Sequence, residues 1–551
     1  MRSYEVLSLH LEKCLADLGL QKPDKAVIEP PKDKKFGDLA ANWALLLGKA
    51  AGENPRRLAD TLARALRESS EHIARAEAAG PGFINVAFSP SFWQGVILEA
   101  EEAGDRFGAS LIGKGQKAQV EFVSANPTGP LHIGHGRGAA VGDSLARILR
   151  FAGFEVETEY YINDAGRQMR TLGRSIFLRL LALAGKGGED YPPDCYQGGY
   201  VTDIAGEMLA ADPGLAALPE EEGIERCRVY GAEVIFAGIR KDLLDFNVRH
   251  EVWFSERGLL ERGEVERTID ELRAGGFIYE EEGALWFRSG ALGDDKDRVL
   301  KKSDGSLTYF ASDVAYHADK YRRGFTSITD VWGADHHGYI GRMRAAVAAL
   351  GYPAESFEVL LVQLVNLLRD GEQVAMSTRA GTFETLADVL KETGADAARF
   401  MFLSRRSDSK LDFDLSLVRQ RSMDNPVYYV QYAHARIKAV LRRAAERGIG
   451  ALPGEARVLA LLELEEELDL MRMLDRFPQV AADAARASAP HFITAYLMEL
   501  SGLLHRYYAG HQVLGAGCED LVFARLRLLK AVGRCLANGL GLLGVTAPES
   551  M

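Results

Sequence analysis

The sequence predicts an α/β protein, with a parallel-sheet central domain between an α+β N-terminal domain and an all-α C-terminal helical bundle. Residues 118–162 change from strand to helix to strand, earlier residues mix helical and alternating patterns, and residues after 422 show helical spacing. A chain of 551 residues, 47% of them hydrophobic, is long enough for several domains with their own cores. We expect the domains at residues 1–112, 113–421 and 422–551.

The N-terminal domain combines both periodicities. Apolar residues recur at helical spacing, and Gly82 to Phe88 alternates as a strand does. The expected helical positions are Leu7, Leu11, Leu15, Leu39, Trp43, Leu46 and Leu47.

The central domain opens with a βαβ unit. Residues 118–124 form a β-branched apolar run, 138–151 carry apolar residues at helical spacing, and 154–162 are rich in Val, Thr and Tyr. A glycine at 153 ends the helix, so the two strands are expected to be parallel neighbours joined by a crossover.

The loop between strand and helix suits an anion. At the carboxyl end of a parallel strand, a helix start offers unpaired N–H groups and a positive dipole end, which favour phosphate. His132 and His135 are three residues apart and fall on one side of the first turn, while Gly134, Gly136 and Gly138 allow close approach to the backbone. A capped helix start with two solvated histidines is the alternative.

The rest of the central domain is divided by a polar insertion near residues 186–225, which we expect to break the sheet in two. Further strands are expected at 253–254, in a hairpin over 275–287, and at 307–310, 329–333 and 359–364.

Tyr309 lies at the end of one of these strands, and Asp313 lies four residues further on. If a helix starts there, their spacing of four points both side chains into one cleft. Alternatively, Ser312 or Asp313 caps a helix and Tyr309 belongs to the core.

The C-terminal residues form long amphipathic helical stretches, at 427–440, 458–474, 490–508 and 521–543. Aromatic and cationic residues mix there, as on base-stacking surfaces or in helix interfaces. These residues are Tyr428, Tyr429, Tyr432, His505, Arg506, Tyr507 and Tyr508.

Composition limits the possible partners. The net charge of −12 provides no overall basic field, so contact with RNA must be local. Five scattered cysteines without a CxxC pair argue against a disulfide framework or a zinc ribbon and fit a reducing cytoplasm. No apolar run approaches the roughly 20 residues that span a bilayer, so we expect no membrane partner.

The segment ANPTGPLHIGH, residues 125–135, resembles the extended HIGH signature of class I aminoacyl-tRNA synthetases, and among them the arginyl-tRNA synthetases. The resemblance extends over nearly the whole chain and implies a Rossmann-type catalytic domain, an N-terminal domain that touches the tRNA elbow, and an anticodon-binding bundle. It includes residues 163–168, 309–313, 376–379 and 425–436.

The resemblance implies ligation of L-arginine to tRNA(Arg) through an arginyl-adenylate, with ATP as substrate together with Mg²⁺. It assigns catalysis to His132, His135, Ser377 and Arg379. It assigns arginine binding to Glu121, Ser124, Asn126, Tyr309, Asp313 and His336. It assigns ATP binding to Pro127, Thr128, Gly129, His132, Gly134, His135, Gly138, Met376, Ser377, Thr378 and Arg379.

One signature departs from the family. Where relatives carry KMSKS, Ala375 and Thr378 replace the two lysines, and Arg379 is the remaining cation. Arginine is always charged and can bind phosphate oxygens bidentately, so we expect it to take over the lysines' role.

Two other functions stay open. The chain could be a different HIGH-type class I synthetase or nucleotidyl transferase, or a catalytically weak tRNA-binding protein derived from a synthetase. Asp335-His336-His337 lacks a third ligand at metal spacing, so we expect no protein-bound metal. We expect a cytoplasmic monomer.

Overall fold

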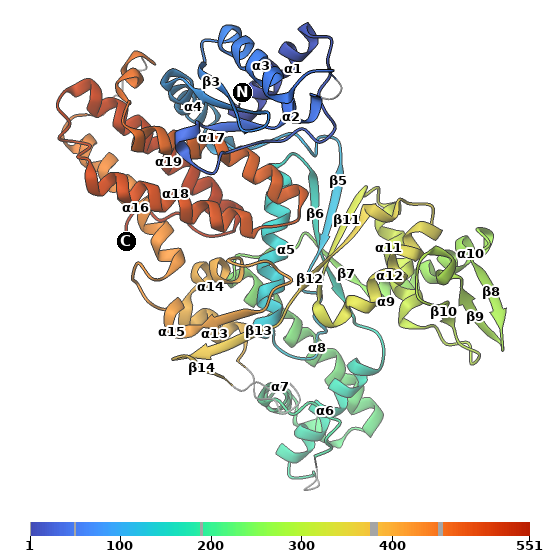
Figure 1. Cartoon of the computed structure of the whole chain (residues 1–551). Helices are drawn as coiled ribbons and strands as arrows, with labels where there is room; N and C mark the ends of the chain where they lie inside the picture. The colour runs from blue at the N-terminus through green and yellow to red at the C-terminus, as the bar shows by residue number, and fades with distance from the viewer. Residues whose placement is uncertain (1, 49–50, 188–190, 375–383, 450–455) are drawn as a thin grey trace.

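A computed structural model of the chain describes residues 2–48, 51–187, 191–374, 384–449 and 456–551. Figure 1 shows the N-terminal module beside the C-terminal helices, with the central sheet below them. Among the described helices, none has the length and apolar character needed to cross a membrane.

The N-terminal module is an antiparallel sheet with helices packed on it, which confirms the α+β expectation. Leu39 is an exception, because it lies in a strand rather than a helix, where it pairs with Val86. A run of three residues is too short for its period to be read. In sheet order the strands are β1 (Ile28–Glu29), β2 (Leu39–Ala41), β4 (Phe83–Phe88) and β3 (Ile73–Ala79), and the helices are α1 (Ser3–Asp17), α2 (Trp43–Leu47), α3 (Pro55–Ser69) and α4 (Pro90–Ala103).

The central sheet has five strands, and every neighbouring pair is parallel. The helix α5 (Ile133–Phe151) joins the first two strands of this sheet in chain order, which are parallel neighbours, so the βαβ unit is confirmed. A Cβ on Gly142 of α5 would lie 2.2 Å from Phe122, which follows the central strand of the sheet, so this helix packs closely against the sheet. In sheet order the strands are β12 (Phe357–Val362), β11 (Ser327–Gly333), β5 (Lys117–Glu121), β6 (Glu155–Ile162) and β7 (Val252–Ser255).

The insertion divides the chain but not the sheet. The strand β5 pairs with β6 from one half of the domain and with β11 from the other, so a single continuous sheet forms. The expectation of a sheet broken in two is therefore wrong, because the inserted residues fold as helices beyond the strand ends. The helix inside the insertion is α7 (Gly199–Ala211), and it is flanked by α6 (Arg167–Leu183) and α8 (Glu220–Asp245).

A second, antiparallel sheet lies beside the central one and contains the expected hairpin. The predicted strand at 307–310 is wrong, because α11 begins at Tyr309. Thr308 caps this helix by accepting a hydrogen bond from the Ala311 N–H, so neither Ser312 nor Asp313 is the cap. The elements are α9 (Glu256–Glu261), α10 (Glu264–Ala274), β8 (Ile278–Glu281), β9 (Ala284–Phe287), β10 (Arg298–Lys301), α11 (Tyr309–Arg322) and α12 (Ile340–Ala349).

A small three-stranded sheet connects this region to the C-terminal helices. The expected helix at 458–474 is instead a 3₁₀ turn followed by a helix that begins at Glu465. The elements are β13 (Val365–Arg369), β14 (Glu372–Gln373), α13 (Leu386–Thr393), α14 (Ala395–Phe402), β15 (Leu411–Asp414), α15 (Leu415–Val418), α16 (Pro426–Glu446), α17 (Glu465–Arg486), α18 (His491–Gly510) and α19 (Glu519–Leu542). Short 3₁₀ turns occur at Lys34–Phe36, Gly104–Arg106, Pro213–Ala217, Ser289–Leu292, Ala334–Tyr339, Ala354–Ser356 and Ala456–Leu461.

The core of the C-terminal helices is continuous with the rest of the molecule. Phe477 of α17 stacks on Phe107 from the N-terminal linker and also contacts Phe151 of α5. The buried Arg399 donates a 2.7 Å hydrogen bond to the Leu543 carbonyl after α19. Deleting the C-terminal helices would expose this shared core. The function of these helices therefore has to be tested by substitutions on their surface.

Candidate active site

The two histidines of the HIGH segment stack on each other at the start of α5. Their ring centroids lie 3.6 Å apart with an angle of 18° between the planes. His132 is the N-cap, and its Nδ1 accepts hydrogen bonds from the N–H groups of Gly134 and His135 at 3.1 and 3.3 Å. The Nδ1 of His135 accepts in return from the His132 N–H at 3.3 Å.

This geometry determines how the histidines can act. Because each Nδ1 is an acceptor, the hydrogen of each neutral ring resides on Nε2. Burial lowers the pKa of His132 and lowers that of His135 to about 3. Both rings are therefore neutral hydrogen-bond donors near pH 7, not the solvated histidines of the alternative interpretation.

The glycines of the loop have different tasks. A Cβ on Gly134 would lie 2.9 Å from the ring of His132, and one on Gly136 would lie 2.7 Å from Leu386. A larger residue at either position would therefore collide with its neighbour. A Cβ on Gly138 would meet nothing within 4 Å, so this position leaves the helix surface open.

The loop between β5 and α5 contains a strained turn. Val123 and Ser124 have φ angles of 72° and 40°, which side-chain-bearing residues rarely adopt. The Ser124 hydroxyl donates to Glu121 Oε1 at 2.9 Å and accepts from the Tyr161 N–H at 3.1 Å. These bonds hold the turn and orient Glu121.

The predicted ATP-binding loop residues lie just beyond this turn. The hydroxyl of Tyr200 in α7 donates to the Thr128 carbonyl at 2.6 Å, and it would lie 3.1 Å from a Cβ on Gly129. Pro127 lies between this contact and Asn126, whose side chain donates to Gln168 at 2.8 Å. The insertion thus supports the loop.

Four predicted residues, Met376, Ser377, Thr378 and Arg379, lie outside the described residues, as does Ala375. The described chain resumes close to the histidines, because Thr385 forms an antiparallel bridge with His132. The Leu386 N–H also donates to the Leu131 carbonyl at 2.8 Å.

All six residues expected to bind arginine line one cavity of about 450 Å³ at the carboxyl ends of the central strands. They are Glu121, Ser124, Asn126, Tyr309, Asp313 and His336. Sequence reasoning missed four aromatic residues of the same cavity, because no local pattern indicates that their rings converge: Tyr161, Tyr316, Trp332 and Tyr339.

The two carboxylates predicted to bind arginine, Glu121 and Asp313, have different partners. Lys320 donates to Glu121 at 2.6 Å, so this carboxylate is already in an ion pair. Asp313 accepts a 2.6 Å hydrogen bond from the Tyr339 hydroxyl, and burial raises its pKa. Among the described residues, no cation forms an ion pair with Asp313. An arriving cation therefore has Asp313 as its counter-ion.

The remaining two residues lie at the edge of the cavity. Tyr309 is 66% exposed as the first residue of α11. The side chain of His336 is 63% exposed, in the 3₁₀ turn after β11. Within the described part of the chain, no group of three His, Cys, Asp or Glu side chains converges in a way that could hold a metal ion.

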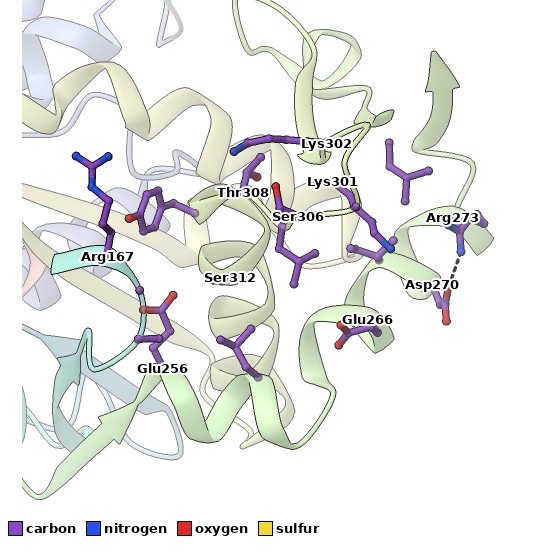
Figure 2. Close-up of a pocket in the computed structure, with 18 residues that line it drawn as sticks. Arg167, Glu256, Glu266, Asp270, Arg273, Lys301, Lys302, Ser306, Thr308 and Ser312 are labelled. Atoms are coloured by element: carbon purple, nitrogen blue, oxygen red, sulfur yellow. Dashed lines mark hydrogen bonds and ion pairs between the residues drawn. The ribbon is translucent and has the colours of Figure 1, made fainter. Parts of the chain in front are cut away.

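A larger cavity of about 1000 Å³ shares Tyr309 with the first. Figure 2 shows Arg167 and Glu256 at one end of it, and Glu266 and the Asp270–Arg273 pair at the other. Burial, followed by the charge of Asp313, raises the pKa of Glu256 to about 7.

We expect the melting temperature of Glu256→Gln to increase relative to the wild type as the pH rises from 5 to 8. The pKa of Glu256 is about 7 in the folded protein and 4.5 ordinarily, so the folded chain binds more protons between these values. Wild-type stability therefore decreases with rising pH in this window, and glutamine removes the decrease. Differential scanning fluorimetry at each pH measures the difference, with the exposed Glu266→Gln as control. A difference that does not change with pH would contradict the expectation.

A parallel sheet with a stacked histidine pair at the start of its first crossover helix agrees with the resemblance to the catalytic domain of class I aminoacyl-tRNA synthetases. The family model "tRNA synthetases class I (R), catalytic domain" matches residues 103–176 and 221–412. "Arginyl tRNA synthetase N terminal domain" matches 5–88, and "DALR anticodon binding domain" matches 430–551. The chain belongs to the arginyl-tRNA synthetase family, as the resemblance predicted.

Full-length relatives agree with this assignment. The chain is 62% identical to an arginine–tRNA ligase of Nitratidesulfovibrio vulgaris strain Miyazaki F and 60% identical to one of Oleidesulfovibrio alaskensis, in both cases over 100% of both chains. The arginyl-tRNA synthetase structure of Thermus thermophilus shares the fold, with a TM-score of 0.77 and 24% identity over 99% of this chain and 100% of that one.

Proposed function

We propose that this protein activates L-arginine with ATP and transfers it to tRNA(Arg), releasing AMP and diphosphate. The observation that carries the proposal is Asp313, a carboxylate without an ion-pair partner among the described residues, in a cavity lined by all six expected arginine-binding residues. A guanidinium presents a fixed charge and five donors, and burying it requires such a partner.

Activation needs positioning and charge stabilisation, and no covalent enzyme intermediate. The carboxylate of arginine attacks the α-phosphate of ATP, which enters together with Mg²⁺, and diphosphate leaves. The Nε2–H groups of His132 and His135 donate hydrogen bonds to the phosphate oxygens, and the positive end of the α5 dipole favours their charge. Ser377 and Arg379 hold the β- and γ-phosphates in this proposal, on sequence grounds.

Transfer then uses the two outer domains of the protein. We assign residues 1–112 to the tRNA elbow, 113–421 to catalysis and 422–551 to the anticodon. A ribose hydroxyl at the tRNA 3′ end attacks the arginyl carbonyl, and AMP leaves. The protein acts as a cytoplasmic monomer in this proposal.

An aromatic surface on α16 and α18 supports the anticodon assignment. Tyr428 and Tyr432 stack at 5.9 Å, and Tyr432 stacks on His505 at 6.0 Å. Arg436 lies over the rings of both Tyr432 and Tyr508, each at 4.6 Å. These side chains are partly exposed and offer ring faces and a cation to unstacked bases.

Tyr507, which was grouped with this surface, belongs to the core instead. Its side chain is fully buried, and its hydroxyl donates to Glu467 at 3.1 Å.

We expect Tyr428→Ala to raise the KM for tRNA(Arg) about 5- to 100-fold, because stacking contributes roughly 1–3 kcal/mol per base. The KM values for arginine and ATP should change by less than twofold. Steady-state aminoacylation measures all three. Phe492→Ala, which removes another exposed aromatic side chain of the same helical region, is the matched control. Equal KM values for tRNA in both variants would remove this surface from recognition.

ATP–diphosphate exchange tests the proposed function. The family resemblance implies that arginine activation requires tRNA, so we expect arginine-dependent exchange only when tRNA(Arg) is present. Exchange that depends on another amino acid would indicate a different class I synthetase. Tight tRNA binding without exchange would indicate a tRNA-binding protein derived from a synthetase.

A further inference from the structure

A fully buried lysine lies beneath the arginine cavity. Lys320 of α11 donates to Glu121 Oε2 at 2.6 Å and to Asp330 Oδ1 at 2.8 Å. Its Nζ also lies 4.4 Å from the ring centroid of Tyr316. Two carboxylates and one ring face thus surround the ammonium group, which has three donors. Although burial alone would lower the pKa of Lys320, Asp330 and Glu121 raise it above its ordinary value.

A histidine supplies the second cation of the buried cluster that contains Lys320, Glu121 and Asp330. His317 Nδ1 lies 2.7 Å from the Asp313 carbonyl oxygen, and Nε2 lies 2.9 Å from Asp330 Oδ2. Both partners are acceptors, so the ring satisfies both only when each nitrogen carries a hydrogen. Burial would raise the pKa of Asp330, but Lys320 and His317 lower it to about 2, so Asp330 is ionised.

The positive and negative charges of this buried cluster balance. Lys320 and the doubly protonated His317 face Glu121 and Asp330, and the next carboxylate, Glu159, is paired with Arg323 at 2.6 Å. Within the described chain, the Asp313 carboxylate accepts a hydrogen bond from the Tyr339 hydroxyl at 2.6 Å and forms no ion pair. The pKa of Glu256, which burial raises to about 7, keeps this carboxyl partly protonated at neutral pH.

We propose that Lys320 is a positioning residue that, with His317, neutralises Glu121 and Asp330, so that Asp313 alone supplies the negative charge that selects the substrate's guanidinium. The inference rests on the proposed function. Glu121 then contributes through its position: its Oε1 is held by Ser124 at 2.9 Å and serves as a hydrogen-bond acceptor. Without Lys320, two buried carboxylates would repel each other, and Glu121 would leave this position.

Calorimetric titration of the wild type and of charge variants with L-arginine tests the inference. We expect Lys320→Met to weaken arginine binding at least 30-fold, while the Kd for ATP changes less than threefold. The double variant Glu121→Gln/Lys320→Met removes one anion and one cation and leaves His317 and Asp330 paired. We expect its Kd for arginine within about fivefold of the wild type and tighter than that of either single variant.

The outcomes separate the inference from the proposed function. A double variant that binds arginine no better than Glu121→Gln would overturn the inference, because the substrate would then need the charge of Glu121. That comparison holds even if Lys320→Met fails to fold, and melting temperatures identify this case. A wild-type protein that binds no arginine, with or without tRNA, would instead overturn the proposed function.

Discussion

Replacing Asp313 with Asn should weaken L-arginine binding by at least 100-fold, while the affinity for ATP stays within twofold of the wild type. The substitution keeps the size of the side chain and a partner for the Tyr339 hydroxyl, but it removes the counter-ion of a buried guanidinium. Truncating one partner of a buried charge pair costs roughly 2–5 kcal/mol. Calorimetric titration measures the change directly.

A neutral isostere of the substrate sharpens this test. L-Citrulline replaces the guanidinium with a urea group, so the wild type should prefer arginine strongly, and Asp313→Asn should lose most of that preference. Asp335→Asn removes an exposed acidic group nearby and serves as the control. An arginine affinity of Asp313→Asn within threefold of the wild type would show that another group carries the recognition.

Replacing His135 with Ala should slow adenylate formation by about 10²- to 10³-fold, as expected for the loss of one preorganised donor at a developing anion. Substrate affinities should change much less, because the donor acts mainly in the transition state. Single-turnover kinetics of adenylate formation measure this rate. The control is His72→Ala, which changes an exposed histidine of the N-terminal module.

The pH dependence adds a second criterion for His135. Burial lowers its pKa to about 3, so the imidazole does not titrate between pH 6 and 9. The ratio of wild-type to His135→Ala rates should therefore be constant over that range. A ratio that rises toward pH 6 would mean that His135 acts as a cation, against the hydrogen-bond geometry of its Nδ1.

Local patterns in the sequence were sufficient to predict the βαβ unit and the histidine pair. The helix start lies at Ile133 rather than Gly138, because the side chains of His132 and His135 cap it reciprocally. The sequence spacing of three predicted their proximity. The strand expected at 307–310 is wrong because a single threonine cap, Thr308, outweighs a short run of apolar and aromatic residues.

Long-range contacts could not be predicted in this way. Lys320 is 199 residues from Glu121 in the chain, and no local pattern joins them. The positive φ of Val123 is imposed by the surrounding structure, since valine does not favour it locally. The distinction between Glu121, which is ion-paired, and Asp313, which has no ion pair among the described residues, therefore emerges only from the three-dimensional structure.

The central claim is that this chain charges tRNA with arginine and no other amino acid. The most direct measurement incubates the purified protein with ATP, Mg²⁺, unfractionated tRNA and all 20 amino acids, digests the tRNA with ribonuclease, and identifies the aminoacyl-adenosine by mass spectrometry. We expect arginyl-adenosine alone, formed with one AMP per ester. The account would be contradicted by an ester of any other amino acid, or by no ester at all from protein that binds tRNA.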